Sequence, residues 1–181
     1  MKKQKGFTLI ELMVGIAILG VMLTIAIPNF SHWTVKMRVD DEINSLQRLI
    51  LTARNTAVNM ELPVRVCPLV GNECTNSWDK ELTVFIDIDA DGKYNAANDE
   101  VLIRTKAAIK SGDTLTFNSA SVIFRSTGRG GPAGTFTYCP ADYPDKNRSI
   151  VLSSFGRTYL SSDTDNDGID EDISGAEPSC S

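Results

Sequence analysis

Hydrophobic residues recur at helical spacing between Val39 and Ala57. The apolar positions are separated by steps of three and four residues, which places them on one face of an α-helix, and they are Val39, Ile43, Leu46, Ile50, Ala53 and Ala57. Charged residues such as Asp41 and Arg48 fall on the other faces, and Pro63 follows as a helix-ending residue. The pattern predicts a helix that ends near Asn59 and packs its apolar stripe on a globular head.

An apolar run precedes this stripe. Residues 7–27 contain one charged side chain, Glu11, and three lysines lie within residues 2–5. At a rise of about 1.5 Å per residue the run is about 31 Å long, which matches a bilayer core of about 30 Å. We therefore predict a single inner-membrane span with the lysines on the cytoplasmic side. A cleaved secretory signal is the alternative, but residues 28–30 are Pro-Asn-Phe and offer no small-residue cleavage site.

Glu11 is unusual within such a run. A carboxylate in a membrane helix costs about 2.5–3.5 kcal/mol on insertion scales and usually marks a function. We expect Glu11 to have a partner in some assembled state. A weak anchor that tolerates one acid near its end is the alternative.

The hydrophobic pattern changes after Pro63. Short runs rich in Val, Ile, Phe and Thr alternate with Gly, Pro, Asn and Asp, which is typical of antiparallel strands. We predict about seven strands, with an eighth at 157–160, and the seven are 64–66, 82–87, 101–105, 114–117, 121–124, 135–138 and 149–153. Trp78, Phe85 and Tyr138 are expected in the core rather than at a ligand site.

Composition argues against an enzyme. The chain of 181 residues has one histidine, His32, so triads and metal clusters that need imidazole are nearly excluded. Asp87, Asp89 and Ser126 are accompanied by no base, oxyanion loop or cofactor fingerprint. We predict a non-enzymatic protein with no catalytic residue and no required cofactor.

Residues 6–11, Gly-Phe-Thr-Leu-Ile-Glu, resemble the class III signal of type IV pilins and type II secretion pseudopilins. The resemblance implies that a prepilin peptidase cleaves between Gly6 and Phe7 and methylates the new amino group of Phe7. Glu11 would then pair with the Phe7 amine of a neighbouring subunit and set the axial register. Pro28 resembles the proline at which pilin helices kink or melt. Cleavage removes three of 18 basic residues, leaving 15 against 23 acidic ones, a net charge of −8.

The rest of the chain resembles the H-type pseudopilin and FimT/FimU group. The matching segments are Val66-Cys67-Pro68, Val84-Phe85-Ile86-Asp87, Phe124-Arg125-Ser126-Thr127-Gly128 and Phe155-Gly156-Arg157. The resemblance implies an α+β pilin fold, in which a long helix packs on a head of two antiparallel sheets. The expected parts are a leader (1–6), a membrane or filament-core half of the helix (7–29), its amphipathic half (30–60), and a β-rich head with an acidic tail (61–181).

Four cysteines lie in the part of the chain predicted outside the inner membrane, where disulfides persist. Among the three pairings, we favour Cys67 with Cys74, which closes a turn-rich loop, and Cys139 with Cys180, which would hold the tail. A zinc site is disfavoured because no C-x-x-C spacing occurs.

Two aspartate-rich segments have the alternate spacing of calcium loops followed by glycine, and the aspartates are Asp87, Asp89, Asp91, Asp163, Asp165 and Asp167. Both depart from the EF-hand pattern, since Asn98 and Ser174 occupy the twelfth positions. The first also resembles a hairpin of the pilin group that often binds nothing. Calcium is the one cation that the sequence suggests, and a solvated acidic surface is the alternative.

Three functions fit these features. The leading hypothesis is a FimU-like minor pilin that primes assembly or caps the pilus tip, with the major pilin and other minor pilins as partners. The second, a FimT-like DNA receptor, would use Arg129, Arg148 and Arg157, but Tyr159 replaces the second arginine of the Gly-Arg-x-Arg motif. The residues after Arg157 are strongly acidic, so DNA is disfavoured as a partner. An H-type pseudopilin of a type II secretion system is the third.

Overall fold

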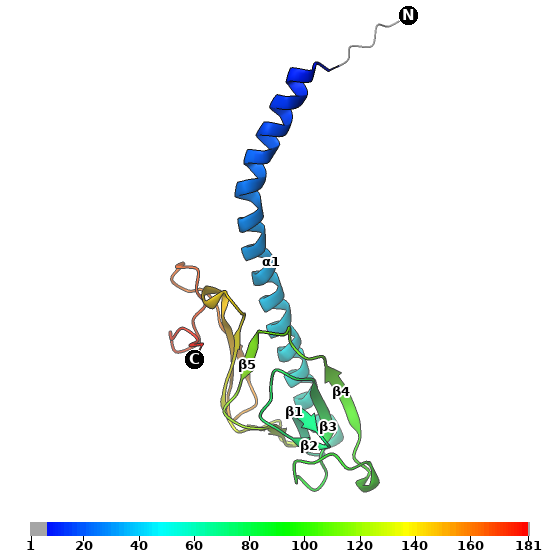
Figure 1. The fold of residues 1–181 in the computed structure, drawn as a ribbon. Coiled ribbons are helices and arrows are strands. Elements are labelled where there is room, and N and C mark those ends of the chain that lie inside the picture. Colours follow the sequence, from blue (N-terminus) through cyan, green and yellow to red (C-terminus); the bar gives the residue numbers. More distant parts are fainter. Residues whose placement is uncertain (1–6, 181) are drawn as a thin grey trace, which may run out of the picture.

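A single long helix organises the molecule. The computed structural model describes residues 7–180, apart from the side chains of residues 25, 26, 28 and 29. The helix α1, Leu9–Met60, has 52 residues. Figure 1 shows that its first half projects away from the head, whereas its second half lies against the strands. The backbone stays helical across Pro28, and α1 as a whole curves gently. Melting of the helix at Pro28 on entry to a filament stays a prediction.

The helix ends close to the predicted residue. Glu61 caps α1 in the left-handed conformation, with φ of 57°, and Pro63 prevents further helix. β1 then begins at Val64. The predicted stripe is correct, because every one of its residues is at most 1% exposed, and Leu49 joins it.

The head contains two antiparallel sheets. The first sheet has the strand order β4-β3-β1-β6-β7, with β2 paired to β1, and its strands are β1 Val64–Val70, β2 Glu73–Cys74, β3 Leu82–Ile86, β4 Leu102–Lys106, β6 Val122–Phe124 and β7 Gly130–Gly131. The second sheet has the order β10-β9-β8-β5, and its strands are β5 Thr114–Thr116, β8 Gly134–Cys139, β9 Arg148–Leu152 and β10 Thr158–Leu160. Two short 3₁₀ helices, Ala96–Asn98 and Pro144–Lys146, lie in the connections.

All eight predicted strands are present, with shifted ends. The first was predicted to stop at Val66, but β1 continues through Pro68 to Val70. β6 pairs with β1 only as far as Val66, so Pro68 lies beyond that pairing, and its carbonyl accepts a hydrogen bond from Thr75 N at 3.0 Å. The strands β2 and β7 were missed because each has two residues, too few for a periodic pattern.

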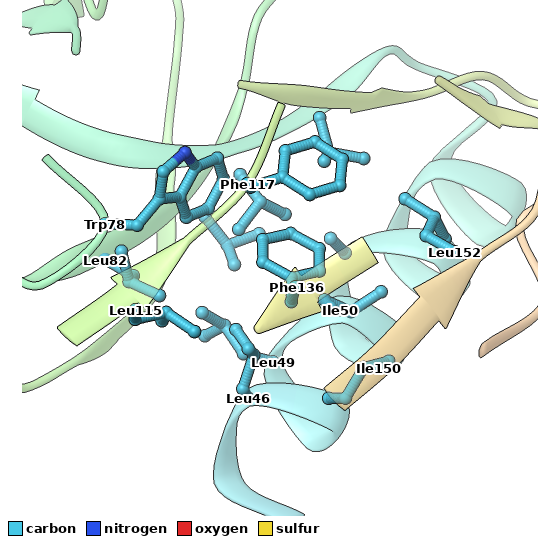
Figure 2. Close-up of a cluster of buried hydrophobic side chains, with 14 of the residues drawn as sticks. Leu46, Leu49, Ile50, Trp78, Leu82, Leu115, Phe117, Phe136, Ile150 and Leu152 are labelled. Atoms are coloured by element: carbon cyan, nitrogen blue, oxygen red, sulfur yellow. The ribbon is translucent and has the colours of Figure 1, made fainter. Parts of the chain in front are cut away.

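The core lies between α1 and the two sheets. Leu46, Leu49 and Ile50 of α1 are buried, and Figure 2 shows them on the helix beside side chains of the second sheet, Phe136, Ile150 and Leu152. The rings of Phe117 and Phe136 stack at 4.0 Å between centroids. Trp78, Phe85 and Tyr138 are each at most 1% exposed, which confirms that they are core residues.

Both favoured disulfides are present. Cys67 within β1 is bonded to Cys74 at the end of β2, with their Cα atoms 5.5 Å apart. Cys139, the last residue of β8, is bonded to Cys180 across a sequence separation of 41 residues. The second bond therefore ties the carboxyl-terminal segment to the second sheet.

Candidate functional site

The amino-terminal half of α1 carries the largest exposed apolar surface among the described residues. Fifteen large side chains are each at least half exposed, and they are Phe7, Leu9, Ile10, Leu12, Met13, Val14, Ile16, Ile18, Leu19, Val21, Met22, Leu23, Ile27, Phe30 and Trp33. They surround the helix instead of forming one stripe. A helix that is apolar on all sides is stabilised when other apolar groups cover it, so this half is suited to an apolar environment.

Glu11 lies at the start of this surface and is held by its own helix. Its Oε2 accepts hydrogen bonds from Thr8 N at 2.8 Å and from Thr8 Oγ1 at 2.9 Å, while Glu11 N donates to Thr8 Oγ1. This reciprocal arrangement is a capping box. The predicted cleavage residue Gly6 lies outside the described residues, and Phe7 is 91% exposed.

By length and mean hydropathy, none of the helices in residues 7–180 qualifies as a membrane-crossing segment, in contrast to the span predicted from the sequence.

Asp113 joins α1 to the second sheet. It is 5% exposed, and it accepts hydrogen bonds from Arg38 of α1, from the hydroxyl of Tyr138 and, at 2.9 Å, from Ala141 N. Burial, followed by the hydrogen bond to the Asp113 carboxylate, raises the pKa of Tyr138 well above its ordinary value. A buried carboxylate needs such partners, and here they fix the helix to the head just below the projecting half.

Arg148 forms a second junction on the same helix. Its guanidinium contacts Asp40 Oδ1 of α1 at 2.6 Å, Asp170 Oδ2 of the tail at 2.6 Å and the carbonyl of Ser161 at 2.7 Å. The carboxyl-terminal segment is thereby held beside α1, where Figure 1 shows it next to the helix.

The arginines predicted for DNA binding do not all lie together. Arg148 is bound to Asp40 and Asp170 and is separate from the other two. Arg129 stacks over the ring of Phe155 at 5.1 Å, and the turn that holds Arg129 contacts the turn before Arg157 at Gly156. Arg129 and Arg157 are exposed, as is Arg125, so this end of the head is locally basic.

The first aspartate loop differs from its predicted composition. Asp87 is fully buried and forms an ion pair with Arg65, and Asp89 Oδ2 accepts from Asn98 Nδ2 at 3.2 Å. Asp91 is not part of the cluster, because its carboxylate caps the backbone N–H of Lys93 at 2.7 Å. The cluster is completed instead by Glu100, which is 4% exposed.

The second loop brings its three predicted aspartates together. One carboxylate oxygen each from Asp163, Asp165, Asp167 and Glu171 lies within 4.8 Å of the others. The aspartates are exposed and Glu171 is 7% exposed. Gly168, with φ of +95°, makes the turn that closes the loop.

Glu100 and Glu171 were missed as site residues. Neither occupies the twelfth loop position, at which an EF-hand has its glutamate. Glu100 is brought to its cluster by the turn after β3. Asp170 and Glu171 offered a signal, since they continue the acidic spacing of the loop. The sequence offered no comparable signal for Asp113.

Two family models match the chain. The model described as type II transport protein GspH matches residues 42–156. The model of the prokaryotic N-terminal methylation motif matches residues 1–27, the segment that contains Gly6, Phe7 and Glu11.

Curated relatives match over shorter segments. A fimbrial protein of Pseudomonas aeruginosa is 43% identical over 58 residues, which are 32% of this chain and 37% of that protein. The type IV major fimbrial protein FimA of Dichelobacter nodosus is 30% identical over 99 residues, 53% of this chain and 52% of that protein. The chain thus spans about half or less of the length of these relatives.

Among solved structures, the type IV minor pilin FimU of Pseudomonas aeruginosa has a TM-score of 0.57 at 20% identity, covering 72% of this chain and 92% of FimU. At this identity the likeness establishes the fold, a long helix packed on antiparallel sheets. The GspH model establishes the family, because it covers residues 42–156 of a 181-residue chain. The protein therefore belongs to the GspH family of pilin-like proteins and carries their N-terminal methylation motif.

Proposed function

We propose that this protein is a minor, non-enzymatic subunit of a type IV pilus, which primes assembly or occupies the tip. The observation that carries the proposal is the apolar half of α1, whose large side chains are exposed on all sides and are rigidly continuous with a folded head. Such a helix is suited to packing among the helices of other subunits, while the head remains outside the bundle.

Glu11 would guide this packing. After cleavage between Gly6 and Phe7, the methylated amino group of Phe7 in one subunit would lie near the Glu11 carboxylate of another. In the single chain the Glu11 carboxylate accepts two hydrogen bonds from Thr8. In the filament the charged Phe7 amine of a neighbouring subunit would replace these neutral donors. Prepilin peptidase, the major pilin and other minor pilins remain predicted partners. The protein is also predicted to lie in the inner membrane before assembly.

An H-type pseudopilin of a type II secretion system is the second candidate. It is favoured by the matched family, which is described as type II transport protein GspH. The same helix and the same Glu11 would serve a pseudopilus, so the two functions differ in their neighbours and not in this chain's chemistry.

The decisive experiment compares major pilin sheared from the surface of a deletion strain, the complemented strain, and strains that express Glu11→Ala or Glu81→Ala. Glu81 is an exposed residue immediately before β3 and serves as the matched control. We expect surface pili to disappear on deletion, to return with Glu81→Ala and to stay absent with Glu11→Ala. Unchanged pili in the deletion strain would refute the proposal.

The same strains separate the second candidate. If surface pili are unchanged but extracellular enzymes accumulate in the periplasm of the deletion strain, the protein serves secretion.

DNA binding is a third candidate, and one observation favours it. Arg125, Arg129 and Arg157 lie at one end of the head beside the exposed ring of Phe155. Cations gathered beside an aromatic ring can bind phosphates and stack on a base. A gel shift that weakens with salt and with Arg129→Ala and Arg157→Ala, but not with Arg104→Ala, would support this candidate. No shift at micromolar protein would reject it.

A further inference from the structure

We propose that the loop formed by residues 163–171 binds one calcium ion. Its ligands are the carboxylates of Asp163, Asp165, Asp167 and Glu171, whose oxygens converge within 4.8 Å. Four negative charges at this separation repel one another strongly, and a bound cation removes that repulsion. The inference does not depend on whether the filament is a pilus or a pseudopilus.

Glu171 supplies the observation that points to a ligand. Its Oε2 is fixed by Thr164, whose backbone N and Oγ1 donate at 2.7 and 2.6 Å. Its Oε1 is buried and has no hydrogen-bond partner. The backbone is held as well, because Glu171 and Ser162 exchange two hydrogen bonds. A buried carboxylate oxygen without a donor costs free energy, and a cation at the convergence point would satisfy it.

The loop also holds its aspartates in place. Backbone N–H groups of Asn166 and Gly168 donate to the two oxygens of Asp163, at 2.7 and 3.1 Å. Asp165 and Asp167 each accept one backbone hydrogen bond in the same way. Each carboxylate oxygen has a second lone pair, so these bonds leave capacity for a metal.

The first acidic cluster differs from this loop in the charges around it. Asp87 already has a cation beside it, because Arg65 pairs with Asp87 and also donates to Ala90 O. Among the described residues, no Lys or Arg lies within ion-pair distance of the four carboxylates of the 163–171 loop. The loop therefore has charge that the protein itself does not compensate.

Calcium fits the ligand chemistry best. The ligands are all hard carboxylate oxygens, whereas zinc favours nitrogen and sulfur, and magnesium demands a rigid octahedral site. The carboxylates occupy positions one, three, five and nine of an EF-hand-like loop, and Ile169 stands at position seven, where a backbone carbonyl is used. Without a glutamate at position twelve, we expect weak binding, with Kd on the order of 10⁻⁴–10⁻³ M.

Calcium binding in this loop would be linked to α1 through Arg148. Asp170, which lies between loop ligands, contacts Arg148 at 2.6 Å, and Arg148 contacts Asp40 of α1 at 2.6 Å. The loop and the helix also line one small cavity, to which Gly168, Asp170, Lys36 and Val39 contribute. Calcium would therefore hold the carboxyl-terminal segment against the helix.

The test is calorimetric titration of calcium chloride into the mature chain in detergent, after removal of calcium with a chelator. We expect one ion per chain, and loss of binding in Asp165→Asn and in Glu171→Gln. Asp165 is exposed, so Asp165→Asn should fold even if Glu171→Gln does not. Asp89→Asn, in the first cluster, is the matched control and should bind normally.

Hydrogen exchange provides a second readout, in which calcium should slow exchange across residues 161–176 in the wild type and not in Asp165→Asn. The proposal is overturned if millimolar calcium gives no heat. It is also overturned if Asp165→Asn binds like the wild type, or if Asp89→Asn alone abolishes binding, which would place the ion in the first cluster.

Discussion

At the scale of single residues, Asp113 connects three separate parts of the fold. It precedes β5, and it accepts hydrogen bonds from α1, from β8 and from the segment after β8. Removing one member of a buried ion pair leaves the other without compensation, which costs more than an exposed pair is worth.

We predict that Asp113→Ala lowers the free energy of unfolding by about 3 kcal/mol, because Arg38 and the hydroxyl of Tyr138 lose their acceptor. Asp145→Ala is the control, since Asp145 pairs at 2.6 Å with Lys146 while its side chain stays 46% exposed. The control should change stability by less than about 1 kcal/mol. Urea unfolding measures both, and equal changes would contradict the assigned role of Asp113.

Tyr138 leads to a prediction about pH. Because its pKa is raised in the folded state, the folded protein keeps the phenol proton more tightly than the unfolded chain. The resulting stability is complete below the unfolded pKa of about 10 and declines as pH rises above it. In urea unfolding between pH 8 and 11 we expect Tyr138→Phe to lose less stability than the wild type. Parallel pH curves for the two proteins would contradict this prediction.

At the scale of elements, two turns of the head are packed against each other and against α1. A Cβ at Gly156 would lie 2.2 Å from the carbonyl oxygen of Gly128 and 3.0 Å from Arg54 Nε. Arg54 of α1 already donates to that carbonyl at 3.0 Å. The turn after β9 therefore approaches the turn after β6 too closely for any side chain.

Gly156→Ala should therefore lower the free energy of unfolding by about 3 kcal/mol, because an alanine there has both an unfavourable left-handed backbone and a steric clash. Gly175→Ala is the matched control, because Gly175 also has positive φ, +81°, and its Cβ would meet nothing within 4 Å. The control should cost about 1 kcal/mol. Thermal unfolding distinguishes the two variants, and equal losses would show that the clash relaxes.

The two disulfides should contribute unequally. In the chain-entropy model the Cys139–Cys180 bond, with a separation of 41 residues, stabilises by about 4 kcal/mol, and the Cys67–Cys74 bond, with a separation of 7, by about 2–3 kcal/mol. Replacing each pair by serine and measuring denaturant unfolding tests this order. A larger loss on removal of Cys67–Cys74 would show that native-state effects outweigh loop entropy.

At the scale of the whole molecule, α1 extends beyond the head, and the ring contact of His32 with Tyr143, 5.1 Å between centroids, lies near the point where the helix leaves it. The core of the head begins near Val35 and Val39 of α1, whereas the large apolar residues before Trp33 are exposed. The head should therefore fold with the same stability whatever lies on the projecting half.

We predict that Ile18→Asp blocks incorporation into filaments and leaves the melting temperature of the head unchanged, because Ile18 is 53% exposed and belongs to the helix surface offered to other subunits. Val70→Asp, at a similarly exposed apolar residue of the head, is the control and should be incorporated. Immunodetection in sheared filaments and calorimetry measure the two effects. A lowered melting temperature in Ile18→Asp would contradict the independence of the two parts.

Features with a local cause could be predicted from the sequence. The stripe from Val39 to Ala57 follows the period of the helix, and the eight longer strands follow composition and turn residues. Cys67 and Cys74 are close in sequence, so their pairing follows from a short loop. The motif at Gly6–Glu11 could be recognised from the sequence because it is a run of adjacent residues, and the N-terminal methylation model matches residues 1–27.

Tertiary structure alone decided which distant side chains meet. Glu100 replaces Asp91 in the first cluster, since the turn after β3 directs Asp91 to the backbone of Lys93. Arg148 is separated from Arg129 because β9 places it beside α1. The physical reason is that sheet register, turn conformation and helix packing set the positions of these groups together, whereas periodicity describes only the neighbours of each residue along the chain.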